Sequence, residues 1–434
     1  MVVLLKILQV ILALSILILV HEFGHFIFAK LFKIRVEKFY LFFDVGFSLF
    51  KFKPKNSDTE YGIGWLPLGG YCKISGMIDE SMDTEALKSE PKPWEFRSKP
   101  AWQRLLVMFG GVLFNFIFAI IVYIGIMAGW GETYISNEEN SIYVNELAYE
   151  MGFRNGDRIL KFDDYTPERF EMLQADMARQ TARKATVLRD GDTVNIYIDQ
   201  NMIGEVLNSP GMFDLAIPFV VDTVPATSAN STAGLMKGDR IAAIDGKPIK
   251  FLQDSRALLS DYEGKEIDIT VLRDRDTLDI PVQVDTAGRL GIYASIPGVK
   301  TKEYSVISAI PAGIRHTFST IGGYIQDLKL VFTPSTEAYK SVGSFIAMGQ
   351  IFPAAWDWYR FLNILALLSI MLGVMNLIPI PALDGGHILF TLYEMVTGKK
   401  PSDKFLAAAQ VVGMVLLCGL MILAFGNDIG RLLK

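Results

Sequence analysis

The sequence has only two cysteines and four histidines among its 434 residues, and it has no excess of positive charge. Cys72 lies in a short polar stretch and Cys418 in an apolar run, so we expect neither a disulfide framework nor a cysteine-based zinc site. Both cysteines are expected to be small packing residues. The 42 lysines and arginines are outnumbered by 47 aspartates and glutamates, for a net charge of −5. We therefore expect no nucleic-acid partner.

The first apolar run also lacks the features of a cleaved signal peptide. Only Lys6 supplies positive charge before it, and no small-residue cleavage site follows. The run continues through the motif HEFGH to Leu31. This pattern predicts a retained transmembrane helix.

Hydrophobic residues make up 51% of the chain and charged residues 21%, which is typical of membrane helices combined with soluble modules. A helix needs about 20 apolar residues to cross a bilayer. Four segments meet this requirement, at about 4–31, 102–129, 361–383 and 405–425. The sequence therefore predicts a polytopic α-helical membrane protein with four transmembrane helices.

The distribution of lysine and arginine predicts the orientation of these helices. The loop after the first segment is rich in both residues, and Lys399, Lys400 and Lys404 follow the third. The second segment ends in GWGETYISNEEN, which contains neither. The positive-inside rule then places residues 32–101 and 384–404 in the cytoplasm and residues 130–360 outside.

The outside region contains an internal repeat. The stretch GFRNGDRILKFDDYTPERFEML (152–173) returns 82 residues later as GLMKGDRIAAIDGKPIKFLQDS (234–255), and ATVLRDGDTVNIYID (185–199) returns 84 residues later as ITVLRDRDTLDIPVQ (269–283). The pattern resembles two α+β PDZ domains in tandem, at 130–215 and 216–300, although the first lacks an obvious ligand-loop strand. PDZ domains bind peptides by adding a strand to a sheet edge. The alternative is a pair of spacers whose grooves are not used.

Residues 301–360 are semi-apolar, with glycine, proline and aromatic residues. They suit helices that lie against the membrane interface or against the repeated domains. His316 lies in this region, and we expect it to be a surface or packing residue because no other ligand-type side chains are near it in the sequence.

The motif HEFGH carries the chemistry of the first segment. On a helix, His21 and His25 are separated by four residues and lie on one face, so both imidazoles can reach one metal ion. Glu22 lies beside them and can hold and deprotonate a water molecule. The alternative is a pair of buried histidines that neighbouring helices satisfy, but burying Glu22 as well would be costly in a membrane.

A catalytic zinc ion needs a third protein ligand and an open position for water. The best candidate is Asp384 in NLIPIPALDGGHILF (376–390), at the same membrane end of the third segment as HEFGH in the first. Two prolines before Asp384 break the helix, and two glycines after it permit close approach of the backbone. His387 is the competing ligand. We prefer Asp384 because a carboxylate neutralises the ion.

These motifs together resemble the site-2 protease family of intramembrane zinc metalloproteases, and the resemblance covers essentially the whole chain. It implies a zinc cofactor (Zn2+) held by His21, His25 and Asp384, with Glu22 as the catalytic general base. It also implies that a membrane-associated β-hairpin matches YGIGWLPLGGYCKISG (61–76). Substrate-binding residues under the resemblance are Asn376, Gly69 and Gly70.

The resemblance also implies a function and a location. The protein would cleave single-pass transmembrane proteins within the lipid bilayer in regulated intramembrane proteolysis, namely an anti-sigma factor after a first cut, or remnant signal peptides. The PDZ pair would be periplasmic and would exclude substrates that still carry an external domain. The protein would span the bacterial inner membrane several times, with its active site near the cytoplasmic side.

The expected domain order follows from these inferences. The parts are a membrane part with the HEFGH helix, the hairpin and the second helix (1–129), two PDZ domains (130–215 and 216–300), a membrane-associated helical region (301–360), and the third and fourth helices with the LDGGH motif (361–434). Two other functions are weighed against the protease. A metal-ion transporter predicts inverted repeats among the membrane segments, and none is found. A catalytically silent PDZ scaffold has no need for an intact HExxH motif.

Overall fold

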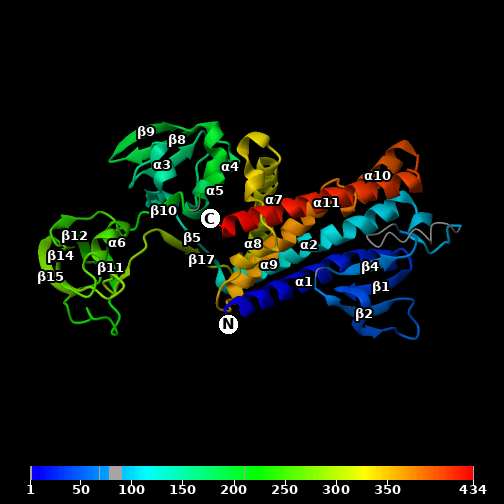
Figure 1. Ribbon diagram of the computed structural model, residues 1–434, viewed down its shortest axis with the longest axis horizontal. Helices are drawn as coiled ribbons and strands as arrows, with labels where there is room; N and C mark the ends of the chain where they lie inside the picture. The colour runs from blue at the N-terminus through cyan, green and yellow to red at the C-terminus, as the bar shows by residue number, and fades with distance from the viewer. Residues whose placement is uncertain (1, 68, 78–89, 210, 434) are drawn as a thin grey trace. The chain divides into compact units, whose positions relative to one another are not determined.

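The computed structural model describes residues 2–67, 69–77, 90–209 and 211–433. Leu68 of the predicted hairpin and Lys88 of the basic loop lie outside the described residues. The chain divides into two compact units (Figure 1). Unit 1 comprises Met1–Gly131, Glu303–Phe332 and Tyr339–Lys434, and unit 2 comprises Glu132–Lys302 and Thr333–Ala338.

The described residues of unit 1 form helices and one small sheet. Its helices are α1 (Val2–Leu31), α2 (Ala101–Trp130), α7 (Val306–Val331), α8 (Phe345–Ile351), α9 (Trp358–Leu377), α10 (Asp384–Thr397) and α11 (Asp403–Leu432). In the described part of the chain, four of them (α1, α2, α9 and α11) are long and apolar enough to cross a membrane. The expected number of membrane helices is confirmed, and the protein is a multi-pass membrane protein.

The third membrane helix is shorter than its sequence predicted. The apolar run indicated a span of about 361–383, whereas α9 ends at Leu377 and α10 begins as a separate helix at Asp384. Ile378 adopts an extended conformation, with ψ at 133°. The residue before a proline is driven out of the helical region, and Pro379 follows Ile378. The two prolines therefore end the helix earlier than hydropathy alone suggests.

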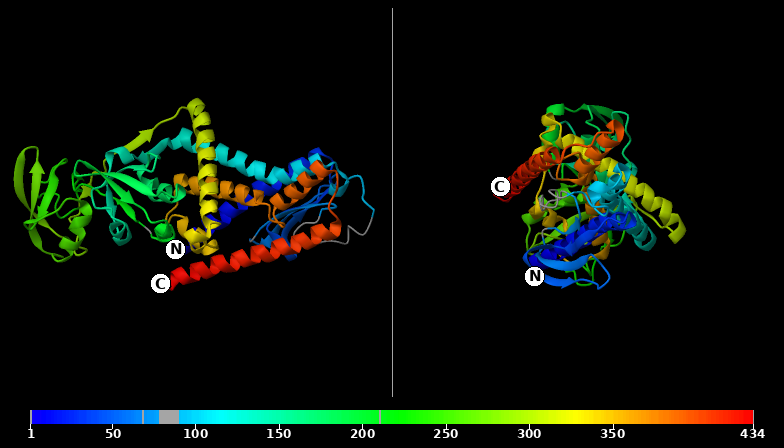
Figure 2. Two further views of the ribbon diagram at one scale, coloured as in Figure 1. Left: turned by 90° about the horizontal axis from the view of Figure 1, so that it is seen from above. Right: turned by 90° about the vertical axis from the view of Figure 1, so that its right-hand side faces the viewer.

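Glycines bring α1 and α2 into backbone contact (Figure 2). A Cβ atom on Gly110 of α2 would lie 2.6 Å from the carbonyl oxygen of Gly24 in α1, and a Cβ on Gly24 would collide with the Gly110 carbonyl. Small residues at such crossings let membrane helices approach closely. The crossing places the HEFGH face of α1 directly against α2.

Two further helices pack on α2. A Cβ on Gly373 of α9 would meet the ring of Phe116 at 2.9 Å, and one on Gly313 of α7 would meet Ile124 at 2.7 Å. Helix α7 leaves apolar side chains such as Ile307 and Phe318 exposed. A helix in this region was expected. Its association with the membrane interface stays a prediction.

Figure 2 shows α11 as the red helix at the edge of unit 1. It is the least buried of the four long apolar helices, because only 11% of its most apolar stretch is buried. Polar contacts attach its C-terminal end to the first turn of α8 and to the segment before it. The carboxylate of Asp428 accepts hydrogen bonds from the Ser344 amide at 2.8 Å and the Ala347 amide at 3.1 Å. Asn427 donates to the carbonyl of Val342 at 3.0 Å.

The sheet of unit 1 differs from the predicted hairpin. Its strands are β1 (Val36–Leu41), β2 (Phe43–Phe52), β3 (Glu60–Leu66) and β4 (Tyr71–Ile74), in the order β2-β3-β1-β4. Residues 61–76 supply β3 and β4, but these strands do not pair with each other. Strand β1 lies between them, parallel to β3 and antiparallel to β4. The prediction of a hairpin within 61–76, which came from the resemblance, was wrong because β1, a strand from earlier in the chain, lies between β3 and β4.

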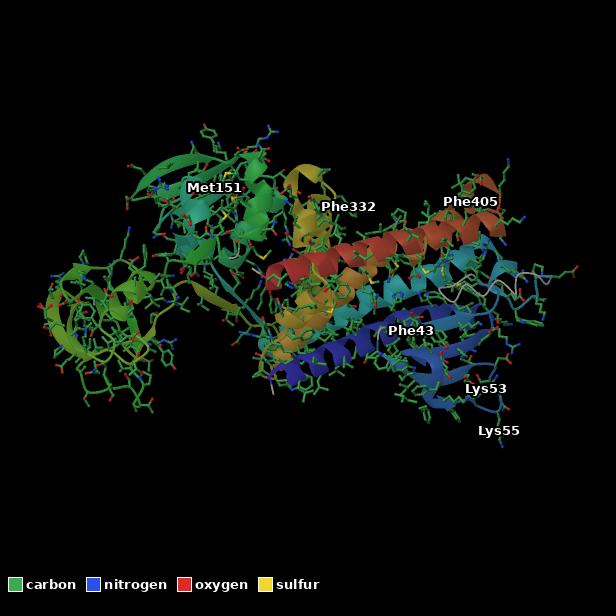
Figure 3. All side chains as sticks on the ribbon, viewed as in Figure 1. Phe43, Lys53, Lys55, Met151, Phe332 and Phe405 are labelled. Atoms are coloured by element: carbon green, nitrogen blue, oxygen red, sulfur yellow. The ribbon has the colours of Figure 1, made fainter. Side chains whose placement is uncertain are left out.

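The consecutive strands β2 and β3 pair antiparallel and form a β-hairpin in this sheet. Val45, Phe47 and Leu49 of its edge strand β2 are exposed, although they are apolar. Figure 3 shows Lys53 and Lys55 projecting from the end of this hairpin. An exposed apolar strand followed by lysines suits contact with lipid and its headgroups, which agrees with the expected membrane association of this region.

Unit 2 contains the remaining strands and four short helices. Its strands are β5 (Glu132–Ile135), β6 (Ile142–Val144), β7 (Arg158–Phe162), β8 (Lys184–Arg189), β9 (Asp192–Tyr197), β10 (Phe213–Leu215), β11 (Val221–Thr223), β12 (Arg240–Ile244), β13 (Lys247–Pro248), β14 (Glu266–Arg273), β15 (Asp276–Gln283), β16 (Tyr293–Ala294) and β17 (Val299–Lys302). Its helices are α3 (Glu146–Glu150), α4 (Leu173–Arg179), α5 (Ile203–Asn208) and α6 (Leu252–Ser260). The first and last strands, β5 and β17, pair antiparallel.

The sequence repeat corresponds to a repeat of structure within unit 2. Strands β7, β8 and β9 form an antiparallel sheet, and β12, β14 and β15 pair in the same order, with β13 added at one edge. In both copies the strand pairing is irregular after the second residue of the first strand. That residue is Ile159 in β7 and Ile241 in β12.

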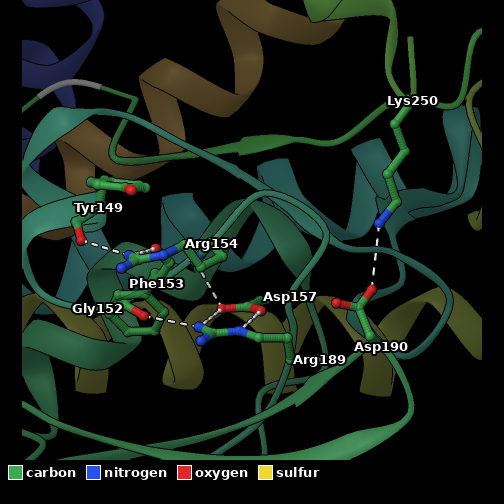
Figure 4. Close-up of polar contacts among 8 residues, drawn as sticks. All are labelled: Tyr149, Gly152, Phe153, Arg154, Asp157, Arg189, Asp190 and Lys250. Atoms are coloured by element: carbon green, nitrogen blue, oxygen red, sulfur yellow. Dashed lines mark hydrogen bonds and ion pairs between the residues drawn. The ribbon is translucent and has the colours of Figure 1, made fainter. Parts of the chain in front are cut away.

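One ion pair explains why the two repeated motifs recur together. Asp157 of the first GDRI motif is fully buried and accepts hydrogen bonds from Arg189 of the first VLRD motif at 2.7 and 2.8 Å (Figure 4). In the second copy, Arg273 makes two bonds of 2.7 Å to Asp239. This guanidinium holds the pKa of Asp239 below its usual range. In each copy of the repeat, the GDRI motif therefore supplies the aspartate and the VLRD motif the arginine of one buried ion pair.

Replacing Asp157 with asparagine is expected to destabilise the β7–β9 sheet. The change leaves Arg189 without its charged partner, and breaking a buried pair costs about 3 kcal/mol or more. Asp190→Asn is the matched control, because the Asp190–Lys250 pair spans 3.6 Å and the Asp190 side chain is 83% exposed. Pulse proteolysis of the full chain in detergent measures both variants, and equal stability of the two would contradict the account.

Candidate metal centre

Helix α1 presents the two histidines of the HEFGH motif to the same point. Both are buried, and their Nε2 atoms lie 3.3 Å apart. Gly111 of α2 packs directly against both imidazole rings. A Cβ atom at Gly111 would lie 2.5 Å from His25 Nε2 and 2.7 Å from His21 Cε1. Only glycine leaves room here for both imidazoles.

Asp384, the first residue of α10, completes the cluster. Its Oδ2 atom lies 3.3 Å from His21 Nε2 and 3.3 Å from His25 Nε2. The glycines after it let α10 begin against the end of α9, because a Cβ on Gly385 would lie 2.6 Å from the carbonyl oxygen of Leu377. Within the described ranges, these three residues form the one group of histidine, cysteine and acidic side chains close enough to hold a metal.

The cluster fits a zinc ion. Four ligand atoms at the usual zinc distances of about 2.0–2.1 Å, arranged tetrahedrally, lie about 3.3–3.4 Å from one another. The three candidate atoms are each 3.3 Å from the other two. Asp384 Oδ2 is also buried and accepts no hydrogen bond within the described structure. A buried carboxylate oxygen without a donor indicates a cation as its partner.

Groups on α2 orient both imidazoles by contacting their Nδ1 atoms, on the side of each ring away from Asp384. The Nδ1 atom of His25 lies 2.8 Å from the carbonyl oxygen of Val107, and that of His21 lies 3.0 Å from the carboxamide nitrogen of Asn115. Both histidines therefore direct Nε2 toward Asp384. Contacts of this kind, on the ring nitrogen that faces away from the metal, are typical of metal-binding histidines.

Glu22 and Asn376 border the cluster without belonging to it. Glu22 is half-buried and accepts a hydrogen bond from the backbone amide of Cys72 in β4. Asn376, near the end of α9, places its carboxamide nitrogen 3.5 Å from His21 Nε2. Both polar groups therefore lie beside the candidate metal ligands.

The other candidate residues take different positions. A Cβ on Gly69 would lie 2.5 Å from the Phe43 ring, and one on Gly70 would lie 2.6 Å from Ile18 of α1. Close packing accounts for both glycines, and their contact with substrate stays a prediction. His387 does not join the metal-ligand group; it lines a cavity of about 50 Å³ with Arg97 and Arg104.

The contribution of α2 to the site was not predicted. The sequence indicated an ordinary membrane span at 102–129, whereas Gly111, Val107 and Asn115 all contact the imidazoles. One signal was available, because Asn115 is a polar residue in the middle of an apolar run, and such residues are usually functional. A backbone carbonyl such as that of Val107 leaves no signal in sequence.

Comparisons with known proteins agree with this geometry. The profile described as peptidase family M50 matches residues 9–420. The chain is 30% identical to a protein of Borreliella burgdorferi named "Putative zinc metalloprotease", over 98% of both chains. It is 29% identical to the regulator of sigma-E protease RseP of Escherichia coli, over 97% of this chain and 98% of that protein.

Proposed function

The chain belongs to peptidase family M50, the site-2 protease family of zinc-dependent membrane proteases, and on this premise we propose that its catalytic centre is the cluster of His21, His25 and Asp384 with Glu22 beside it. The protein is a zinc metalloendopeptidase of regulated intramembrane proteolysis. The observation that carries the assignment of residues is the mutual separation of 3.3 Å among the three candidate ligand atoms.

The residues of the cluster divide the chemistry between them. His21, His25 and Asp384 would hold a zinc ion, which when bound would polarise the scissile carbonyl group and lower the pKa of water. Glu22 takes a proton from the attacking water at its carboxylate and gives it to the leaving amine nitrogen. The Cys72 amide of β4 would hold this carboxylate beside the cluster.

A transmembrane substrate must unwind before it can be cut, because its carbonyl groups are bonded within the helix. Strand β4 is an edge of the unit 1 sheet and contacts α1. An extended segment that paired with this edge would lie beside Glu22, with Asn376 contacting its backbone from the other side of the cluster. Gly69 and Gly70 lead into β4 and would border the same segment.

The repeated modules of unit 2 would act as tandem PDZ domains, at 130–215 and 216–300, that filter substrates by size. In the first module, α5 packs against α4, and the Gln174 side chain donates to the carbonyl groups of Val206 and Ser209. The helix that would border a peptide groove is thus engaged by the chain itself. This contact favours a steric filter over peptide capture for the first module.

The location and substrates complete the proposal. His21 lies about 15 Å along the helix axis from the end of α1 at Leu31 and about 28 Å from its start at Val2. Because the basic loop follows Leu31, the site would lie near the cytoplasmic side of a bacterial inner membrane, with unit 2 in the periplasm. Substrates would be single-pass proteins such as an anti-sigma factor after a first cut, or remnant signal peptides.

Cleavage of a single-pass protein by the full chain in vesicles tests this function. A substrate with a short external stub should be cut faster than the same substrate with a folded external domain. Deleting residues 133–301 should remove the difference, and a short linker can close the gap because Glu132 and Lys302 pair in register. Absence of cleavage with zinc bound would contradict the endopeptidase. If the two substrates are still cut at different rates after the deletion, only the proposed size filter would be contradicted.

A further inference from the structure

We propose that Asn115 is a positioning residue of the catalytic centre, whose carboxamide holds the His21 imidazole at Nδ1 and accepts the Nδ1–H when Nε2 binds zinc. The proposal rests on the proposed function, because it takes His21 to be a zinc ligand. Asn115 is fully buried in α2, and its carboxamide nitrogen lies 3.0 Å from His21 Nδ1.

The two histidines are held by different kinds of group. The Nδ1 atom of His25 faces the carbonyl oxygen of Val107, which can only accept a hydrogen bond. His25 therefore carries its proton on Nδ1 and presents a lone pair at Nε2. Neutral His21 needs the same arrangement to bind zinc through Nε2, so the group behind it must also accept.

A carboxamide can meet this need because it offers both a donor and an acceptor. A half-turn about χ2 exchanges Nδ2 and Oδ1 of Asn115 without moving the helix. Oδ1 is buried and has no hydrogen-bond partner within the described structure. In either orientation one carboxamide atom has no hydrogen-bond partner. The bond to His21 therefore determines which orientation of Asn115 is favoured. With Oδ1 toward His21, Nδ1–H has its acceptor.

The surroundings fix the position from which Asn115 acts. The Ser369 hydroxyl of α9 donates to the backbone carbonyl of Asn115 at 2.9 Å, and Ser369 is fully buried. This bond ties α9, which carries Asn376, to the turn of α2 that carries Asn115. The side chain of Asn115 remains directed at His21. Removing such a partner of a metal-binding histidine weakens metal affinity by roughly 10- to 100-fold.

Zinc affinity of the full-length protein tests the proposal, measured by competition with a fluorescent chelator. Asn115→Leu, which has no acceptor, should weaken zinc binding roughly 10- to 100-fold. Asn115→Asp, which keeps an acceptor in either orientation, should bind zinc at least as tightly as wild type. Thr317→Val is the control, because it removes another fully buried polar group remote from the cluster. Wild-type affinity in Asn115→Leu would overturn the proposal.

A measurement on the wild type avoids the risk that Asn115→Asp fails to fold. The chain has only four histidines, so nitrogen NMR of isotopically labelled histidine is tractable in the zinc-loaded protein. We expect the His21 signals to show zinc at Nε2 and a proton on Nδ1. A deprotonated Nδ1 would overturn the role of Asn115. Absence of zinc from both His21 nitrogens would instead contradict the proposed function.

Discussion

Replacing Glu22 with glutamine is expected to abolish peptide-bond cleavage while zinc remains bound. Glutamine has nearly the size of glutamate but cannot take the proton of the attacking water. Loss of a general base lowers the rate by roughly 10²- to 10⁴-fold. Zinc should be retained, because Glu22 is not one of the three residues that make up the candidate metal site.

The measurement is cleavage of a single-pass substrate in vesicles, together with the zinc content of the same preparation. Glu22→Asp serves as the graded variant, since it keeps the carboxylate and moves it back by one methylene group. We expect it to retain more activity than Glu22→Gln. Equal cleavage by wild type and Glu22→Gln would contradict the assigned role of Glu22.

The second large effect is expected from a single methyl group at Gly111. Its Cβ would lie 2.5 Å from His25 Nε2, closer than real Cβ contacts come. One or both imidazoles must therefore move. Displacing a reacting group by about 1 Å can cost 10²-fold in rate. We expect Gly111→Ala to lose zinc affinity and activity together, by roughly that factor or more.

Gly125→Ala is the matched control for this prediction. It lies in the same helix, and a Cβ there meets nothing within 4 Å. Alanine favours a helix over glycine by about 1 kcal/mol, so neither substitution should unfold α2. Equal zinc affinity in Gly111→Ala and Gly125→Ala would show that the imidazoles do not need the absence of a side chain at Gly111.

The candidate ligands were predictable from sequence because their chemistry is local. His21 and His25 share a helix face by spacing alone, and Asp384 follows a proline break at the same membrane end. The sequence could not give the 3.3 Å separations, because they depend on how α1, α2 and α10 pack. It also could not show that β1 inserts between β3 and β4, because strand order is a tertiary property.

Two other differences have specific physical causes. The third helix ends at Leu377 because a proline disfavours the helical conformation of the residue before it, and hydropathy does not register this preference. The substrate contact that the resemblance implies for Gly69 and Gly70 stays a prediction, and the sequence did not reveal that each glycine also has a packing neighbour that excludes a side chain. Steric demands between distant segments are not visible in the sequence that carries them.

X-ray absorption at the zinc edge of the loaded full-length protein tests the central claim most directly. The account predicts two imidazole ligands, with nitrogen and oxygen ligands alone at about 2.0–2.1 Å. A third imidazole would implicate His387 in place of Asp384. A sulfur ligand at about 2.3 Å would implicate a cysteine, such as Cys72 beside Glu22. Either result would contradict a site made of His21, His25 and Asp384.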